Sequence, residues 1–173
     1  MQFYIAQGIG FIGMISVFIA FQQNEKKKIL WLQAGAAITF AVHFLLLGAF
    51  TGVAMNILLI PRNLLFARKY KKSKQFILTA VFIAAFVILG IVLWENSLSL
   101  LPIIAMSIST VVFTIQNTRN IRFFSLPVSV LWIIYNISVL SIPGVLTEII
   151  CFISILIAIV RFDIPKNKNN RVL

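Results

Sequence analysis

The residues that carry most protein chemistry are scarce in this chain. Its 173 residues include one cysteine, one histidine and four acidic side chains. A single cysteine excludes an intrachain disulfide, and a single histidine without a cluster of further ligands argues against a metal site. No nucleophile has an evident partner base, so we expect no enzymatic activity, no cofactor and no metal. Cys151 is expected to be a small packing residue.

Long apolar runs dominate the chain instead, and 61% of its residues are hydrophobic. Most runs approach the roughly 20 residues with which a helix crosses a hydrocarbon core, while the third and fifth are marginal alone. Helices satisfy their own backbone hydrogen bonds where no water is available. We therefore predict an all-α, polytopic membrane protein with seven transmembrane helices. The runs cover residues 4–21, 29–47, 53–67, 76–94, 100–115, 123–140 and 144–160.

Positive charge is distributed between the runs in an alternating pattern. All but one of the 15 Lys and Arg residues lie beside every second gap, in segments 26–28, 68–74, 119–122 and 161–171. Because basic loops remain cytoplasmic, we predict an outside N-terminus and a cytoplasmic C-terminus in a plasma membrane. The net charge of +11 would suggest nucleic acid for a soluble protein. Here we expect no nucleic-acid partner and assign the clusters to topology and anionic lipid headgroups.

An internal repeat is indicated by a constant offset of 92 residues. Residues 7–69 superimpose on 99–161 without a gap, so that three runs and their connections coincide. We predict two parallel repeats joined by one returning helix, an arrangement that the SWEET sugar facilitators use, with the solute site at the repeat interface. The predicted units are a first repeat, a linker helix, a second repeat and a cytoplasmic tail, at 1–70, 71–98, 99–162 and 163–173.

Five stretches of the chain resemble one known family. They are IAQGIG at 5–10, HFLLLG at 43–48, NILLIPR at 56–62, LLPIIAMSIST at 100–110 and IVRF at 159–162. Over about residues 4–163 the chain is similar to the YgjV-type bacterial inner-membrane proteins. The resemblance implies a bacterial inner-membrane location and a distant relation to SWEET, PQ-loop and nicotinamide riboside carriers. The Pro-Gln pair of PQ-loop proteins is absent after Phe21, so no sugar specificity is inferred.

Polar residues inside the predicted spans are the candidate site, because such groups are costly at membrane depth. Asn56 corresponds to Glu148 under the offset, and His43 corresponds to Tyr135. The likeness to SWEET proteins, where two asparagines contact the solute, implies solute contacts for Asn56 and Glu148. A carboxylate in place of the second asparagine favours an amine-bearing or cationic solute, or a bound proton. The alternative is that Glu148 is a structural hydrogen-bonding group, and its protonation state stays open.

Other span residues have alternative interpretations. Arg62 can pair with Glu148, bind an anionic group, or extend to the inner headgroups. His43 is either a proton shuttle or a hydrogen-bonded packing residue. Trp132, Tyr135 and Asn136 follow helical spacing and form either a wall for the solute or ordinary packing.

Together these observations predict a membrane transport protein. It would be a facilitator or proton-linked carrier of a small polar solute that works by alternating access. The alternative is a membrane solute sensor or receptor without transport. A homo-oligomer is compatible with the sequence, which leaves the solute and the coupling ion open.

Overall fold

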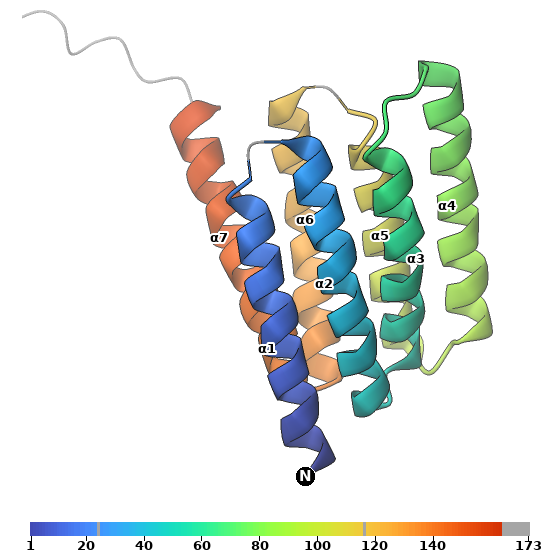
Figure 1. The fold of residues 1–173 in the computed structure, drawn as a ribbon, viewed down its shortest axis with the longest axis vertical. Coiled ribbons are helices and arrows are strands. Elements are labelled where there is room, and N and C mark those ends of the chain that lie inside the picture. The colour runs from blue at the N-terminus through green and yellow to red at the C-terminus, as the bar shows by residue number, and fades with distance from the viewer. Residues whose placement is uncertain (24, 116, 164–173) are drawn as a thin grey trace, which may run out of the picture.

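The structure, a computed structural model, describes residues 1–23, 25–115 and 117–163. This described part contains seven α-helices, one short 3-10 helix and no strand (Figure 1). The elements are α1 (Gln2–Phe21), α2 (Lys26–Leu47), α3 (Phe50–Phe66), α4 (Lys72–Val92), η1 (Ser97–Ser99), α5 (Leu100–Val112), α6 (Thr118–Ser138) and α7 (Ile142–Phe162). The all-helical prediction is confirmed. Apart from Asp163, the predicted tail at 163–173 lies outside the described residues.

Five of the helices are long and apolar enough to cross a membrane. The other two, α3 with 17 residues and α5 with 13, are shorter apolar helices. Several helices begin before the apolar run that predicted them, and α2, α4 and α6 begin at Lys26, Lys72 and Thr118. These first turns are basic because a membrane helix continues past the hydrocarbon core into the headgroup layer, where cationic side chains are favoured.

Successive helices run in opposite directions, so the connections gather at two ends of the bundle (Figure 1). One end, called the basic end below, carries the α1–α2, α3–α4 and α5–α6 connections and the end of α7, with the described Lys and Arg residues other than Arg62. The opposite end carries the remaining turns. There α2 stops at Gly48, whose φ of 75° is readily adopted by a residue without Cβ.

The helices pack as two triplets, α1–α2–α3 and α5–α6–α7. Between the triplets, α1 packs against α7 and α3 packs against α5, and side-chain contacts also join α2 and α3 to α6. Helix α4 packs on α3 and α5 at the edge of the bundle (Figure 1). Helices α2 and α6 begin at Lys26 and Thr118, and α3 and α7 begin at Phe50 and Ile142. Each of these two pairs of starting residues is 92 residues apart.

An apolar core holds α4 against the triplets. Phe82 and Phe86 of α4 are buried beside Met55 of α3 and Ile103 of α5. The outward side of α4 is different, with Ile77 and several other large apolar side chains exposed. A contiguous exposed apolar surface of this kind is what a helix presents to lipid.

The start of α3 depends on a side chain from another segment. Ala49 offers no side-chain cap, and the first N–H groups of a helix lack partners within it. The Glu95 carboxylate, from the segment between α4 and α5, accepts from the backbone N–H groups of Phe50 and Thr51, each at 3.1 Å. This contact fixes the connection after α4 against the first triplet.

Candidate functional site

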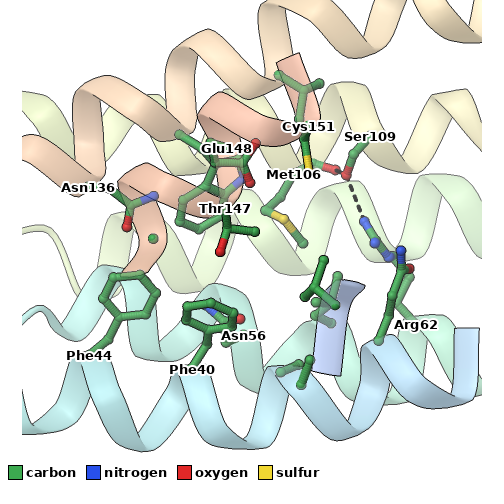
Figure 2. Close-up of a pocket in the computed structure, with 18 of the residues that line it drawn as sticks. Phe40, Phe44, Asn56, Arg62, Met106, Ser109, Asn136, Thr147, Glu148 and Cys151 are labelled. Carbon is green, nitrogen blue, oxygen red and sulfur yellow. Dashed lines mark hydrogen bonds between the residues drawn. The ribbon is translucent and has the colours of Figure 1, made fainter. Parts of the chain in front are cut away.

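A cavity of about 210 Å³, the main cavity below, lies between the two triplets. Side chains from all six helices of the triplets line it, and none comes from α4. The lining residues are Val17, Phe21, Gln33, Ala36, Ala37, Phe40, Phe44, Asn56, Leu59, Arg62, Met106, Ser109, Val128, Trp132, Asn136, Gly144, Thr147, Glu148 and Cys151. Figure 2 shows ten of them by label, with Phe40 and Phe44 on one wall facing Asn136, Thr147 and Glu148 on the other.

The lining has an internal correspondence. Six pairs of lining residues are separated by 92 positions, so equivalent places in the two triplets face the same space. The pairs are Val17 with Ser109, Ala36 with Val128, Phe40 with Trp132, Phe44 with Asn136, Asn56 with Glu148, and Leu59 with Cys151. Within most pairs the second triplet supplies the more polar or more reactive side chain.

A second cavity of about 890 Å³, called the vestibule, continues from the main cavity to the basic end. Arg62, Ser109, Glu148 and Cys151 are among the residues that line both spaces. The vestibule is also lined by Arg122, near the start of α6. The two cavities therefore form one path from the middle of the bundle toward the basic end.

At the opposite end the path is closed by a group that we call the seal: Gln7, His43, Tyr135 and Ser141. Tyr135 is 2% exposed, and its hydroxyl oxygen accepts from the backbone N–H of Gly52 at 2.8 Å. This bond connects α6 to α3 across the two triplets. Tyr135 also packs with Phe44 and Trp132, two residues that line the main cavity.

The remaining members of the seal join the first triplet to α7. His43 is completely buried, with Nδ1 2.7 Å from the Ala6 carbonyl oxygen and Nε2 2.7 Å from Ser141 Oγ. Gln7 of α1 donates to the Leu140 carbonyl at 2.8 Å and accepts from the Ile142 N–H at 3.0 Å. Neither His43 nor Tyr135 lines the main cavity or the vestibule, and both side chains are held by hydrogen bonds in the seal.

Asn56 and Glu148 line the same cavity from opposite triplets. Each lies six residues after the first residue of its helix, at Phe50 and Ile142, which places both at a similar depth. The Asn56 amide nitrogen donates to the Gly52 carbonyl at 2.9 Å, which leaves its side-chain oxygen to accept. The half-buried Glu148 has Ser129 of α6 as a side-chain hydrogen-bonding neighbour.

Arg62 is 3% exposed and connects the triplets near the middle of the bundle. Its guanidinium donates to Ser109 Oγ at 2.8 Å and to Thr110 Oγ1 at 3.1 Å, both on α5, and also to Asn63 Oδ1. The guanidinium carbon lies 4.9 Å from the centre of the Phe113 ring. Arg62 therefore does not extend to the headgroups, and within the described residues no ion pair joins it to Glu148.

Trp132 and Asn136 also line the main cavity. The Trp132 ring stacks on Phe44 with centroids 6.3 Å apart, and Phe44 stacks on Phe40 at 6.2 Å. Asn136 is 2% exposed, and its side-chain oxygen is buried without a hydrogen-bond partner. Gly144 makes room for that amide, because a Cβ at Gly144 would collide with it.

Sequence reasoning missed the face of α2 that lines the main cavity. Gln33, Ala37, Phe40 and Phe44 all face the main cavity, and their spacing of three to four residues follows one face of a helix. That periodicity was readable in the sequence. The rotation of each helix about its own axis was not, because packing against neighbours decides it.

No group of three His, Cys, Asp or Glu side chains that could hold a metal ion occurs among residues 1–23, 25–115 and 117–163. The polar groups of the main cavity are amides, hydroxyls, one carboxyl group, one guanidinium, one indole N–H and one thiol. Such a set can bind a small polar molecule through hydrogen bonds and charge.

Comparison with known proteins agrees with a helical membrane protein. The family model Imp-YgjV, described as a bacterial inner membrane protein, matches residues 4–166. The chain is 29% identical over 150 residues to inner membrane protein YgjV of Escherichia coli strain K12, covering 84% of this chain and 78% of that relative. No solved structure matches significantly. With apolar helices along its length and a family match over nearly all of it, the chain belongs to the Imp-YgjV family of bacterial inner membrane proteins.

Proposed function

We propose that this protein is a facilitator or proton-linked carrier that moves a small polar solute across the membrane by alternating access. The observation that carries the proposal is the main cavity, lined by all six helices of the two triplets and by no residue of α4. In parallel-repeat transporters the solute site lies between the repeats near the midplane. The six lining pairs at an offset of 92 residues support a SWEET-like arrangement of repeat, linker helix and repeat.

The difference between the two ends supports alternating access. The main cavity continues into the vestibule toward the basic end, whereas Tyr135 and His43 are buried at the opposite end. Such a shape suits a carrier whose site faces one side at a time. Because basic loops remain cytoplasmic, the open side is the cytoplasm, the N-terminus lies outside and the C-terminus lies inside.

The solute is small and polar, and we propose that it bears an amine or another cationic group. Glu148 provides an acidic group in the main cavity, and Asn56 provides an amide from the facing triplet. A carboxylate accepts hydrogen bonds and attracts positive charge. The anionic lipids of the cytoplasmic leaflet are the second partner, held by the basic end.

Flux in sealed vesicles tests the proposal. Purified protein is reconstituted, and uptake of labelled amines is compared with uptake by Glu148→Gln, which keeps the shape but removes the charge. We expect at least about a tenfold loss, because hydrogen bonds to charged groups contribute roughly 1.5–3 kcal/mol. Glu25→Gln is the matched control, since Glu25 is an exposed carboxylate at the basic end. Stoichiometric binding of the solute without flux would contradict the carrier and favour a membrane receptor.

The orientation has its own test. In a Cys151→Ser background, single cysteines replace the exposed residues Phe50 and Ile142 at one end and Lys27 at the other. An impermeant thiol reagent added to intact cells should label positions 50 and 142 and leave position 27 unlabelled. Labelling of all three positions from the same side would contradict the proposed topology.

A further inference from the structure

The main cavity contains one basic and one acidic side chain that are not paired with each other. Arg62 and Glu148 are the charged residues of its lining. In the described part of the chain, ion pairs are formed by other residues and none joins these two. An unpaired charge away from water is unfavourable. A solute that carries both a negative and a positive group could pair with Arg62 and with Glu148 at the same time and offset this cost.

The partners of Arg62 are neutral oxygen atoms. Ser109 and Thr110 each accept from Nη1, and Asn63 Oδ1 accepts from Nε and from Nη2. A guanidinium has five N–H groups, so these contacts leave one N–H of Nη2 to donate. The side chain is buried yet lines both cavities. One remaining donor suits a single oxygen of a carboxylate better than the several oxygens of a phosphate.

The other end of the main cavity is suited to an ammonium group. The Asn56 side-chain oxygen is left to accept, because the amide nitrogen is bonded to Gly52, and the Glu148 carboxyl group faces the same space. Asn136 adds an amide whose buried oxygen lacks a partner. An ammonium has three N–H donors, and the rings of Phe40 and Trp132 can contact its positive charge.

The distance between the two ends constrains the solute. Asn56 and Arg62 are six residues apart on α3, which corresponds to about 9 Å along the helix axis. Leu59 and Met106 line the cavity as well and provide apolar contacts for methylene groups.

We infer that the main cavity binds a zwitterionic solute, with its ammonium group between Asn56 and Glu148 and its carboxylate at Arg62. Several bonds separate the two charges of such a solute, as in ω-amino acids. The inference rests on the proposed function in that it assigns the solute class to the same cavity. It adds the requirement that the solute carries a carboxylate, which the solute of an amine carrier does not need.

Binding to the purified full-length protein in detergent tests the inference. Calorimetry is run with the ω-amino acids from glycine to 6-aminohexanoate and with analogues that lack one charge. For γ-aminobutyrate the analogues are propylamine and butyrate. We expect one amino acid of the series to bind at least about tenfold more tightly than both of its analogues, since each lost contact involves a charged group.

Two substitutions locate the charges. Glu148→Gln should abolish the preference for the amino acid over its carboxylate analogue, and Arg62→Gln should abolish the preference over the amine. Arg62 also joins α3 to α5, so Arg62→Lys provides a folded variant that keeps the charge and should retain the second preference. If Arg62→Gln does not fold, the inference is tested by the affinities of the wild-type protein for the amino acid and for its two analogues.

Equal binding of amino acids and amines overturns the inference, and so does the absence of binding by every member of the series. Neither result affects the carrier proposal if Glu148-dependent flux of another amine is observed. A third outcome is that a zwitterion binds but is not transported in sealed vesicles. It contradicts the carrier and leaves the assignment of the two charged subsites intact.

Discussion

His43 Nε2 lies 2.7 Å from Ser141 Oγ, which links α2 of the first triplet to the residue that caps α7 of the second. The Ala6 carbonyl oxygen beside Nδ1 can only accept, so in the neutral ring Nδ1 carries the hydrogen and Nε2 accepts from Ser141. Ser141 Oγ in turn accepts from the N–H of Gly144 at 3.2 Å. One hydroxyl thus satisfies a buried imidazole and a helix terminus.

Ser141→Ala is expected to lower the free energy of unfolding. Leaving the buried His43 nitrogen without a donor costs about 1–3 kcal/mol, and the lost cap of α7 adds about 1 kcal/mol. Unfolding in a denaturing detergent series measures the change. Ser97→Ala, at an exposed serine of the same end, is the control. Equal stabilities of the two variants would show that the His43 contact is not required.

Tyr135→Phe removes only the hydroxyl that accepts from Gly52 N–H. The N–H stays buried without a partner, so we expect a loss of about 1–3 kcal/mol in unfolding free energy. Tyr4→Phe is the matched control, because Tyr4 is 78% exposed at the same end. A Tyr135→Phe protein as stable as wild type would mean that water or a shifted backbone replaces the bond.

Gly10→Ala tests the close approach of α1 to α7. A Cβ at position 10 would collide with the Pro143 and His43 rings, and overpacking of this kind costs roughly 1–3 kcal/mol. Gly8→Ala lies on the same helix with no atom within 4 Å of the added Cβ. It should be neutral or stabilising by up to about 1 kcal/mol, since alanine favours helix. Thermal unfolding of the two variants, compared with wild type, should therefore move in different directions.

Cys151 reports which side of the membrane the cavity faces. It is a free cysteine, the single one in the sequence, and it lines both the main cavity and the vestibule. An impermeant thiol reagent should label it in inside-out vesicles and not in intact cells, because the seal blocks the opposite end. Cys151→Ser should remove all labelling. Equal labelling from the two sides would contradict a closed seal.

The sequence predicted the helices well because the membrane imposes length and hydropathy on each span. It placed the starts of α4 and α6 four to five residues late, at 76 and 123 instead of Lys72 and Thr118. The error arose because hydropathy detects the hydrocarbon core, whereas the helix also includes the basic turn in the headgroup layer.

The site was harder to predict than the fold. The offset of 92 residues identified Asn56 and Glu148, and both line the main cavity. The same offset paired His43 with Tyr135, at a similar depth, but these side chains are turned into the seal. Depth follows from counting residues along a helix, whereas side-chain direction depends on helix rotation and neighbouring side chains, which one sequence does not reveal.

Helix α4 lines neither the main cavity nor the vestibule, and it packs on the triplets chiefly along α3 and α5. The pattern of sequence conservation in α4 should therefore differ from the pattern in the helices that line the main cavity. Across related bacteria we expect the lipid-facing positions of α4 to drift freely among apolar residues, limited by little more than the thickness of the bilayer. The positions that face the main cavity should change rarely and in concert, because a new cargo would demand several of them to be replaced together.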